Sequence, residues 1–129
     1  MGLDMYLLRR RKDDTTNRTG NEVCYWRKAH QIKQWFEENA NYPEGGNLDY
    51  VVVSKEKLQD LVRDCTTVLH YNEMCSDGGV EIAEEIIPDE DGNYDDVYFI
   101  TLRETVAGVS AVIESTDFEN YDILYHDWW

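Results

Sequence analysis

The sequence contains little proline and cysteine and no long apolar run. Its 129 residues include two Pro and three Cys. No apolar stretch approaches the ~18 residues that a membrane-spanning helix needs, so none is predicted. The Cys count is odd and no CxxC pair is present, which favours reduced thiols and predicts a cytoplasmic protein. The N-terminus also lacks the charge order and cleavage site of a signal peptide.

Familiar catalytic motifs are also missing. The sequence has no GxSxG, no phosphate-binding glycine loop and no HExxH. A thiol site could be built only from Cys24, His30 and Asp4. On the predicted helix described below, His30 follows Cys24 by six residues, which places it about 240° further round the helix axis, so the two side chains would not face each other. We therefore expect no catalytic residues and predict a protein that is not an enzyme.

Basic residues are almost absent from the last third of the chain. Residues 1–80 carry 13 acids and 11 bases, whereas residues 81–129 carry 14 acids and a single base, Arg103. The whole chain has a net charge of −15. A strongly anionic part repels nucleic acid and anionic lipid but attracts basic protein surfaces. Solubility is the simpler interpretation of such acidity. The basic cluster Arg9–Lys12 is too small, and too poor in aromatic neighbours, to predict a nucleic-acid patch.

Apolar spacing predicts a central helix over Glu22–Asn39. Its apolar stripe follows helical spacing and consists of Tyr25, Ala29, Ile32 and Phe36. Further along the chain, helices are expected over Lys55 to about His70, capped by Ser54, and from about Asp96 to Glu114. The segment Val80–Ile87 suits a short helix or a strand.

Strands are predicted at both ends of the chain and once in its middle. They are Leu3–Arg10, Tyr50–Val53 and Tyr121–Trp129. The expected fold is α+β: three amphipathic helices packed on a small antiparallel sheet that pairs the N- and C-terminal strands. Residues 1–129 are expected to form a single domain.

Two metal sites can be weighed from ligand spacing. Asp89, Asp91 and Asn93 match the first, third and fifth positions of a calcium loop, but Tyr94 and Ile100 stand where Gly and a bidentate Glu are needed. The segment 89–96 is therefore interpreted as an acidic cap of the following helix. His70 and Cys75 are candidate zinc ligands, although the close CxxC or HxxxH pairs typical of zinc sites are missing. No cofactor is predicted, with zinc kept as an alternative.

The adjacent pair Trp128 and Trp129 closes the chain. Neighbouring residues on a strand point to opposite faces, so we expect one of the two rings to be exposed. An exposed Trp beside acidic residues is a candidate binding anchor.

Several segments resemble a family of small bacteriophage and prophage proteins. They are Met1–Tyr6, Glu22–Ala29 followed by Ile32 and Trp35-Phe36, and Tyr125-His126 with the final Trp129. The resemblance brings no activity with it. It does imply a place of action in the host cell cytoplasm, where phages use small acidic proteins, including anti-CRISPR inhibitors, to disable host defence proteins. Such inhibitors often occupy basic nucleic-acid channels.

The leading hypothesis is a non-catalytic inhibitor whose anionic C-terminal part binds a basic surface on a host protein, such as an RNA-guided nuclease. Charges would accelerate the encounter and aromatic anchors would set affinity. The predicted partner-binding residues are Glu84, Glu85, Asp89, Glu90, Asp91, Asp95, Asp96, Glu119, Asp122, Asp127, Trp128 and Trp129. Direct contact with nucleic acid or membrane is not expected. The alternatives are a small zinc-binding protein or metal-dependent enzyme, and a structural or accessory phage protein.

Overall fold

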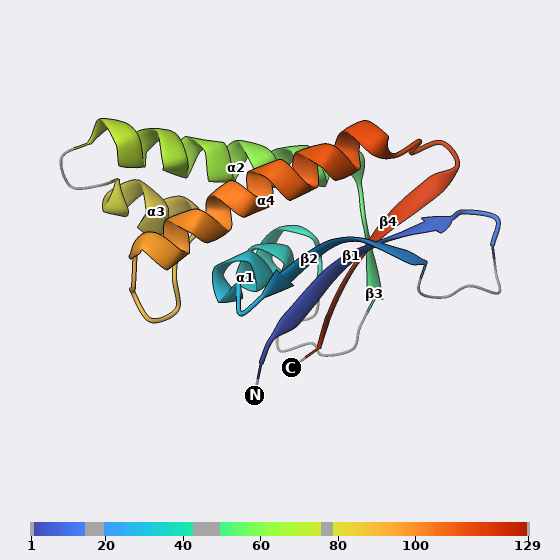
Figure 1. The fold of residues 1–129 in the computed structure, drawn as a ribbon, viewed down its shortest axis with the longest axis horizontal. Coiled ribbons are helices and arrows are strands. Elements are labelled where there is room, and N and C mark those ends of the chain that lie inside the picture. Colours follow the sequence, from blue (N-terminus) through green and yellow to red (C-terminus); the bar gives the residue numbers. More distant parts are fainter. Residues whose placement is uncertain (1, 15–19, 43–49, 76–78, 129) are drawn as a thin grey trace.

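Four helices and four strands make up the part of the chain that the structure, a computed structural model, describes: residues 2–14, 20–42, 50–75 and 79–128. In chain order they are β1 (Asp4–Arg11), β2 (Asn21–Arg27), α1 (His30–Asn39), β3 (Tyr50–Val53), α2 (Lys55–Met74), α3 (Val80–Ile86), α4 (Asp96–Ser115) and β4 (Tyr121–Trp128). The strands form one antiparallel sheet in the order β2-β1-β4-β3 (Figure 1).

The first and last strands lie side by side at the centre of the sheet. They pair from Asp4 opposite Trp128 to Arg11 opposite Tyr121. Leu3, Met5 and Leu7 are buried, as their alternation predicts. The pairing of the two terminal strands and the α+β class are therefore confirmed.

The predicted helix over Glu22–Asn39 is wrong in its first half. Residues 21–27 form β2, which pairs with β1, and the helix begins only at His30. The β-branched and aromatic run Val23–Trp26 fits a half-buried strand, and the pairing with β1 outweighs its helical spacing. Lys28 then takes a positive φ of 58° and donates its N–H to the carbonyl of Leu3, which turns the chain into α1.

Side-chain caps mark the starts of the two long helices. The Ser54 hydroxyl accepts from the Lys57 N–H at 3.1 Å, and the Asp95 carboxylate accepts from the Tyr98 N–H at 3.0 Å. The predicted cap at Ser54 is thus confirmed. The helix α2 continues four residues beyond its predicted end, to Met74. The ambiguous segment that begins at Val80 is the short helix α3.

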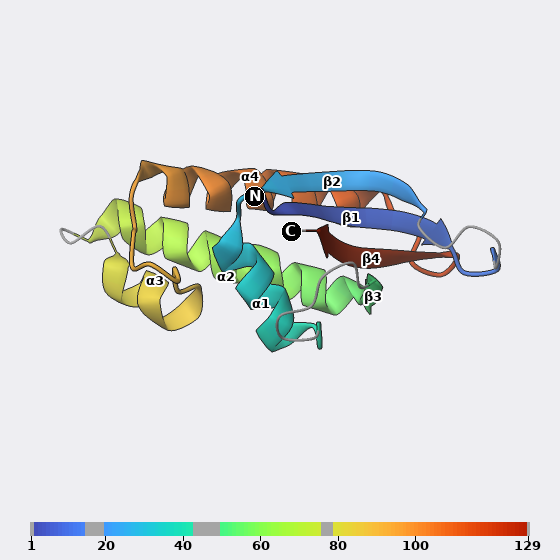
Figure 2. The same ribbon diagram turned by 90° about the horizontal axis from the view of Figure 1, so that it is seen from below.

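The helices α1 and α4 pack on one face of the sheet (Figures 1 and 2). On β4, the Tyr125 ring stacks on Phe36 of α1 with centroids 4.0 Å apart. On β2, the Trp26 Nε1 donates to the Thr105 hydroxyl of α4 at 2.8 Å. A Cβ added to Gly108 of α4 would lie only 3.0 Å from the Cys24 Sγ on β2. The glycine therefore permits the close approach of α4 to β2. The core fills the space between this face and the helices.

No described helix combines the length and the apolar character required to cross a membrane. The prediction from the apolar runs is confirmed for the described residues, which include all four helices.

Candidate functional site

Exposed carboxylates gather at one end of the molecule. This end is formed by α3, the turn that follows it and the first turn of α4 (Figure 1). We call it the acidic end and define it by the exposed side chains of Glu81, Glu84, Glu85, Glu90, Asp91 and Asp96. Within the described residues these six carboxylates form no ion pair and accept no hydrogen bond.

Two neighbouring carboxylates belong to the fold instead. The Asp89 Oδ2 accepts from the N–H groups of Asp91 and Asn93, at 3.1 and 2.9 Å, and so closes the acidic turn. Asp95 caps α4. The expectation that segment 89–96 caps the following helix is met by Asp95. Asp96 adds a negative charge in the first turn, where the helix dipole favours it.

The predicted site residues Glu119 and Asp122 lie at the opposite end, where α4 connects to β4 (Figure 1). This end also holds the basic cluster Arg9–Lys12. The Lys12 Nζ lies 4.0 Å from Asp122 Oδ1. These two acids therefore do not extend the acidic end, and the predicted site is divided by the length of α4.

Asp127 is not a surface residue at all, which corrects its predicted role in partner binding. Its side chain is fully buried and accepts three bonds: from Lys33 Nζ at 2.8 Å, from the Tyr42 hydroxyl at 2.7 Å and from the Tyr125 hydroxyl at 2.9 Å. Burial, and then the Asp127 carboxylate, raise the pKa of Tyr125. The cation and both hydroxyls together satisfy a charge that would otherwise be very costly to bury.

Trp128 is 59% exposed, which agrees with the expectation that one of the two final rings is exposed. It lies opposite Asp4 in the sheet, far along the strand from Asp122. Trp129 lies outside the described residues.

Exposed apolar side chains accompany the acidic end, and the sequence reasoning missed them. Met74 is 69% exposed at the end of α2, and Val97 is 68% exposed in the first turn of α4. The sequence could not show that these two side chains are exposed, because the exposure of an apolar residue depends on which face of its helix the neighbouring helix covers. This end of the molecule therefore carries exposed apolar side chains as well as carboxylates.

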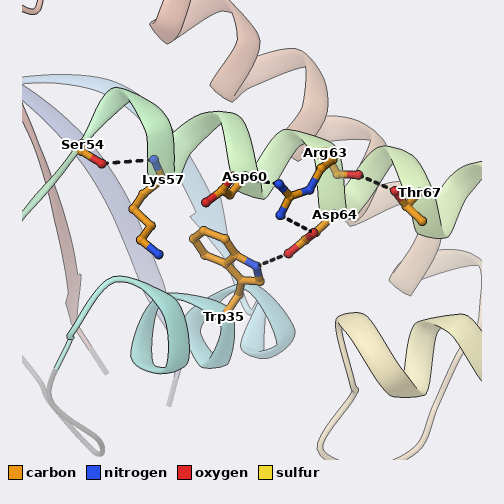
Figure 3. Close-up of polar contacts among 7 residues, drawn as sticks. All are labelled: Trp35, Ser54, Lys57, Asp60, Arg63, Asp64 and Thr67. Carbon is orange, nitrogen blue, oxygen red and sulfur yellow. Dashed lines mark hydrogen bonds and ion pairs between the residues drawn. The ribbon is translucent and has the colours of Figure 1, made fainter.

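Two carboxylates of α2, Asp60 and Asp64, have partners within the protein. Between α1 and α2, the Trp35 Nε1 donates to Asp64 Oδ2 at 2.9 Å (Figure 3). Arg63 pairs with Asp60 at 3.0 Å and with Asp64 at 3.3 Å (Figure 3). These two acids have partners, whereas the six carboxylates of the acidic end have none within the part of the chain that the structure describes.

The two candidate zinc ligands are exposed, and the described residues hold no group of three His, Cys, Asp or Glu that could bind a metal ion. Asp77, which follows Cys75 closely in the sequence and carries a possible ligand group, lies outside the described residues. The nearby Cys65 is buried in α2, and burial raises the pKa of its thiol. Among the described residues, no third ligand therefore joins His70 and Cys75.

The conceivable thiol site is not assembled either. Cys24 lies on the helix-covered face of β2, next to Gly108, whereas the Asp4 carboxylate accepts a hydrogen bond from Tyr25 on the other face. Burial raises the pKa of the Cys24 thiol to about 11, so little thiolate is present near neutral pH.

Comparison with protein-family models, with curated proteins and with solved structures gives no match.

Proposed function

We propose that this protein is a non-catalytic inhibitor that docks its acidic end onto a basic, nucleic-acid-binding surface of a host defence protein. The observation that carries the proposal is the set of six exposed carboxylates without partners among the described residues. A basic channel that normally binds phosphates offers the complementary charge. An anti-CRISPR-type target, an RNA-guided nuclease, is the narrower form of the proposal.

Charge and apolar contacts have separate tasks in this proposal. The carboxylates raise the encounter rate with a basic surface, an effect that salt screens. Met74 and Val97 supply exposed apolar area at the same end, which affinity requires beyond charge. The basic cluster Arg9–Lys12 lies at the far end of the molecule, where it does not oppose docking (Figure 1).

The test is affinity capture from host lysate at about 50 mM and about 500 mM salt, which differ strongly in electrostatic screening. We expect a basic, nucleic-acid-handling protein to be retained at low salt and released at high salt. Addition of the chain should then displace labelled nucleic acid from that partner at a fixed stoichiometry. If no such partner is retained at low salt, or if its nucleic acid is not displaced, the proposal is wrong.

Matched charge variants locate the docking surface. The triple variant Glu84→Gln, Glu85→Gln and Glu90→Gln removes three charges from the acidic end. The control variant Glu104→Gln, Glu114→Gln and Glu119→Gln removes three exposed charges elsewhere. We expect the first to lower the association rate about tenfold and the second to change it much less. Equal effects would mean that net charge, and not the acidic end, governs binding.

A further inference from the structure

The sheet face opposite the helices carries a row of aromatic rings that crosses all four strands. The strand register places Tyr25 of β2 opposite Tyr6 of β1, Tyr6 opposite His126 of β4, and His126 opposite Tyr50 of β3. Side chains alternate between the two faces of a strand. Since Asp127 points to the helices, the four rings share the other face.

The rings of this row contact one another. Tyr50 and His126 stack with centroids 4.0 Å apart and planes 1° from parallel. Tyr6 follows, 6.0 Å from His126 and 5.3 Å from Tyr25. Cross-strand aromatic contacts of this kind stabilise a sheet and here also align four rings on one surface.

Further apolar side chains adjoin the row. Leu8, Leu124 and Val52 form the next register line, and Trp128 lies on the other side of the row. We call this surface the open sheet face. An antiparallel sheet with one covered face normally presents polar residues on its second face, so an aromatic second face is unusual for a surface left in water.

Half of the large apolar side chains exposed in the described residues belong to the open sheet face. The four are Tyr25, Tyr50, Val52 and Trp128, with 47%, 43%, 52% and 59% of their surface accessible. These four lie on β2, β3 and β4 beside Leu8, Leu124 and His126, which are at most 8% exposed. Exposed apolar side chains gathered on one face in this way mark an interaction site.

The charges around the open sheet face nearly cancel. Asp4 lies opposite Arg27 at one end of the face, and Arg10 lies opposite Asp122 at the other. Glu22 adds one carboxylate at the β2 edge. The face is thus close to neutral in a chain of net charge −15. A nucleic acid would require a positive surface, and a basic protein would favour the acidic end.

We propose that a second copy of this chain covers the open sheet face, in a two-fold dimer whose sheets pack face to face. A two-fold axis along the strands exchanges β1 with β4, and so places Arg10 over the partner's Asp122 and Tyr6 over the partner's His126. An axis across the strands places Arg10 over the partner's Asp4. Either axis pairs opposite charges and apolar rows, as a self-complementary interface requires.

The size of the face sets the expected strength. Four strands spaced about 4.8 Å apart and seven residues rising about 3.4 Å each give at most roughly 19 by 24 Å, since β3 has only four residues. Two such faces lie near the lower limit for a specific interface, so we expect a concentration-dependent dimer. The two copies also repel each other through their net charges, and therefore added salt strengthens the dimer.

The salt response separates this inference from the proposed inhibitor role. Salt weakens the docking of the acidic end but strengthens the dimer. The acidic end lies outside the open sheet face, so either proposal can fail without the other.

Sedimentation equilibrium of the full chain, from about 1 µM to about 1 mM, tests the proposal over the range expected for a small interface. We expect a monomer–dimer equilibrium. Tyr50→Glu should raise the dissociation constant at least about tenfold. Ile100→Glu is the matched control, because Ile100 is also 43% exposed but lies on α4, and it should change the constant less than about twofold. Circular dichroism verifies the fold of both variants, and Trp128→Asp replaces Tyr50→Glu if the latter does not fold.

Charge reversal identifies the axis. Arg10→Asp should weaken the dimer. Asp122→Arg in the same chain should restore a dimer whose axis runs along the strands, and Asp4→Arg should restore one whose axis runs across them. A monomer at every concentration, equal effects of Tyr50→Glu and Ile100→Glu, or a dimer that only Ile100→Glu disrupts would each overturn the proposal. Binding of labelled single-stranded RNA to the wild type, lost in Tyr50→Glu, would also overturn it in favour of a nucleic-acid ligand.

Discussion

The buried ion pair between Lys33 and Asp127 offers the sharpest test of how this fold is held together. Lys33 lies on α1, 8% exposed, and Asp127 lies on β4 with no exposed surface. The contact spans 94 positions of the chain and joins the last strand to α1. The variant Lys33→Met keeps an unbranched side chain, one heavy atom shorter, and removes its charge. Asp127 then retains only the hydroxyls of Tyr42 and Tyr125.

The expected cost follows from the burial of the remaining charge. Breaking a buried pair by removing one partner typically costs about 3–5 kcal/mol. A domain is stable by only about 5–15 kcal/mol, so this loss is a large share of the total. We expect the midpoint of thermal unfolding to fall by at least about 10 °C. The double variant Lys33→Met with Asp127→Asn should recover part of the loss, because the buried charge of Asp127 is then removed, although Glu37, which lies 4.0 Å from Lys33 Nζ, keeps its charge.

Urea unfolding followed by tryptophan fluorescence measures the free energy of each variant. Lys57→Met on the exposed side of α2 is the control, since it removes the same group from a solvated position and should cost less than about 0.5 kcal/mol. A loss below about 1 kcal/mol in Lys33→Met would refute the reasoning that the pair holds a buried charge. A double variant no more stable than Lys33→Met alone would refute the explanation in terms of an unpaired carboxylate.

Three further predictions concern a cap, a turn and a thiol. Ser54→Ala removes the acceptor at the start of α2 and should cost about 1 kcal/mol in urea unfolding. Gly79→Ala should cost about 1–3 kcal/mol in the same assay, because φ is +74° and the new Cβ would lie 2.7 Å from the backbone N of Asn72. At pH 8, alkylation followed by mass spectrometry should label the exposed Cys75 well before Cys24. The reason is that burial raises the pKa of Cys24 to about 11, so its thiolate fraction becomes large only as the pH approaches that value.

Local signals predicted the long helices and the terminal strands well. The helix α2 begins after the Ser54 cap and α4 at Asp96, where the sequence places them. Caps and amphipathic spacing are properties of neighbouring residues, so they can be recognised without the fold. The same holds for the alternation of Leu3, Met5 and Leu7, which begins one residue before β1.

The division of Glu22–Asn39 into β2 and α1 could not be recognised in this way. Tyr25 and Ala29 have helical spacing with Ile32 and Phe36, and the pattern continues across Lys28 without a proline or glycine. The edge of β1 decides between helix and strand for residues 21–27, because it offers hydrogen bonds to these residues once β1 is in the sheet. Tertiary pairing of this kind overrides local preference.

Charge counted along the chain predicted the acidic end only in part. The count gave the excess of carboxylates after residue 80, but it gave each of them equal weight. The fold assigns Asp95 to a cap, Asp127 to the core and Asp122 to the opposite end of the molecule. Those assignments depend on partners distant in sequence, such as Lys33 for Asp127, and no local pattern reports them.

The buried Asp127 and the open sheet face are linked by the alternation of a single strand. Three donors hold Asp127 on the helix side of β4, which obliges its neighbours His126 and Trp128 to point to the open sheet face. A slip of β4 by one residue would place the rings inside and the carboxylate outside. The ion pair to Lys33 therefore helps to fix the register that creates the aromatic row. It follows that Lys33→Met should weaken the proposed dimer as well as the fold, although Lys33 itself lies on the far side of the sheet.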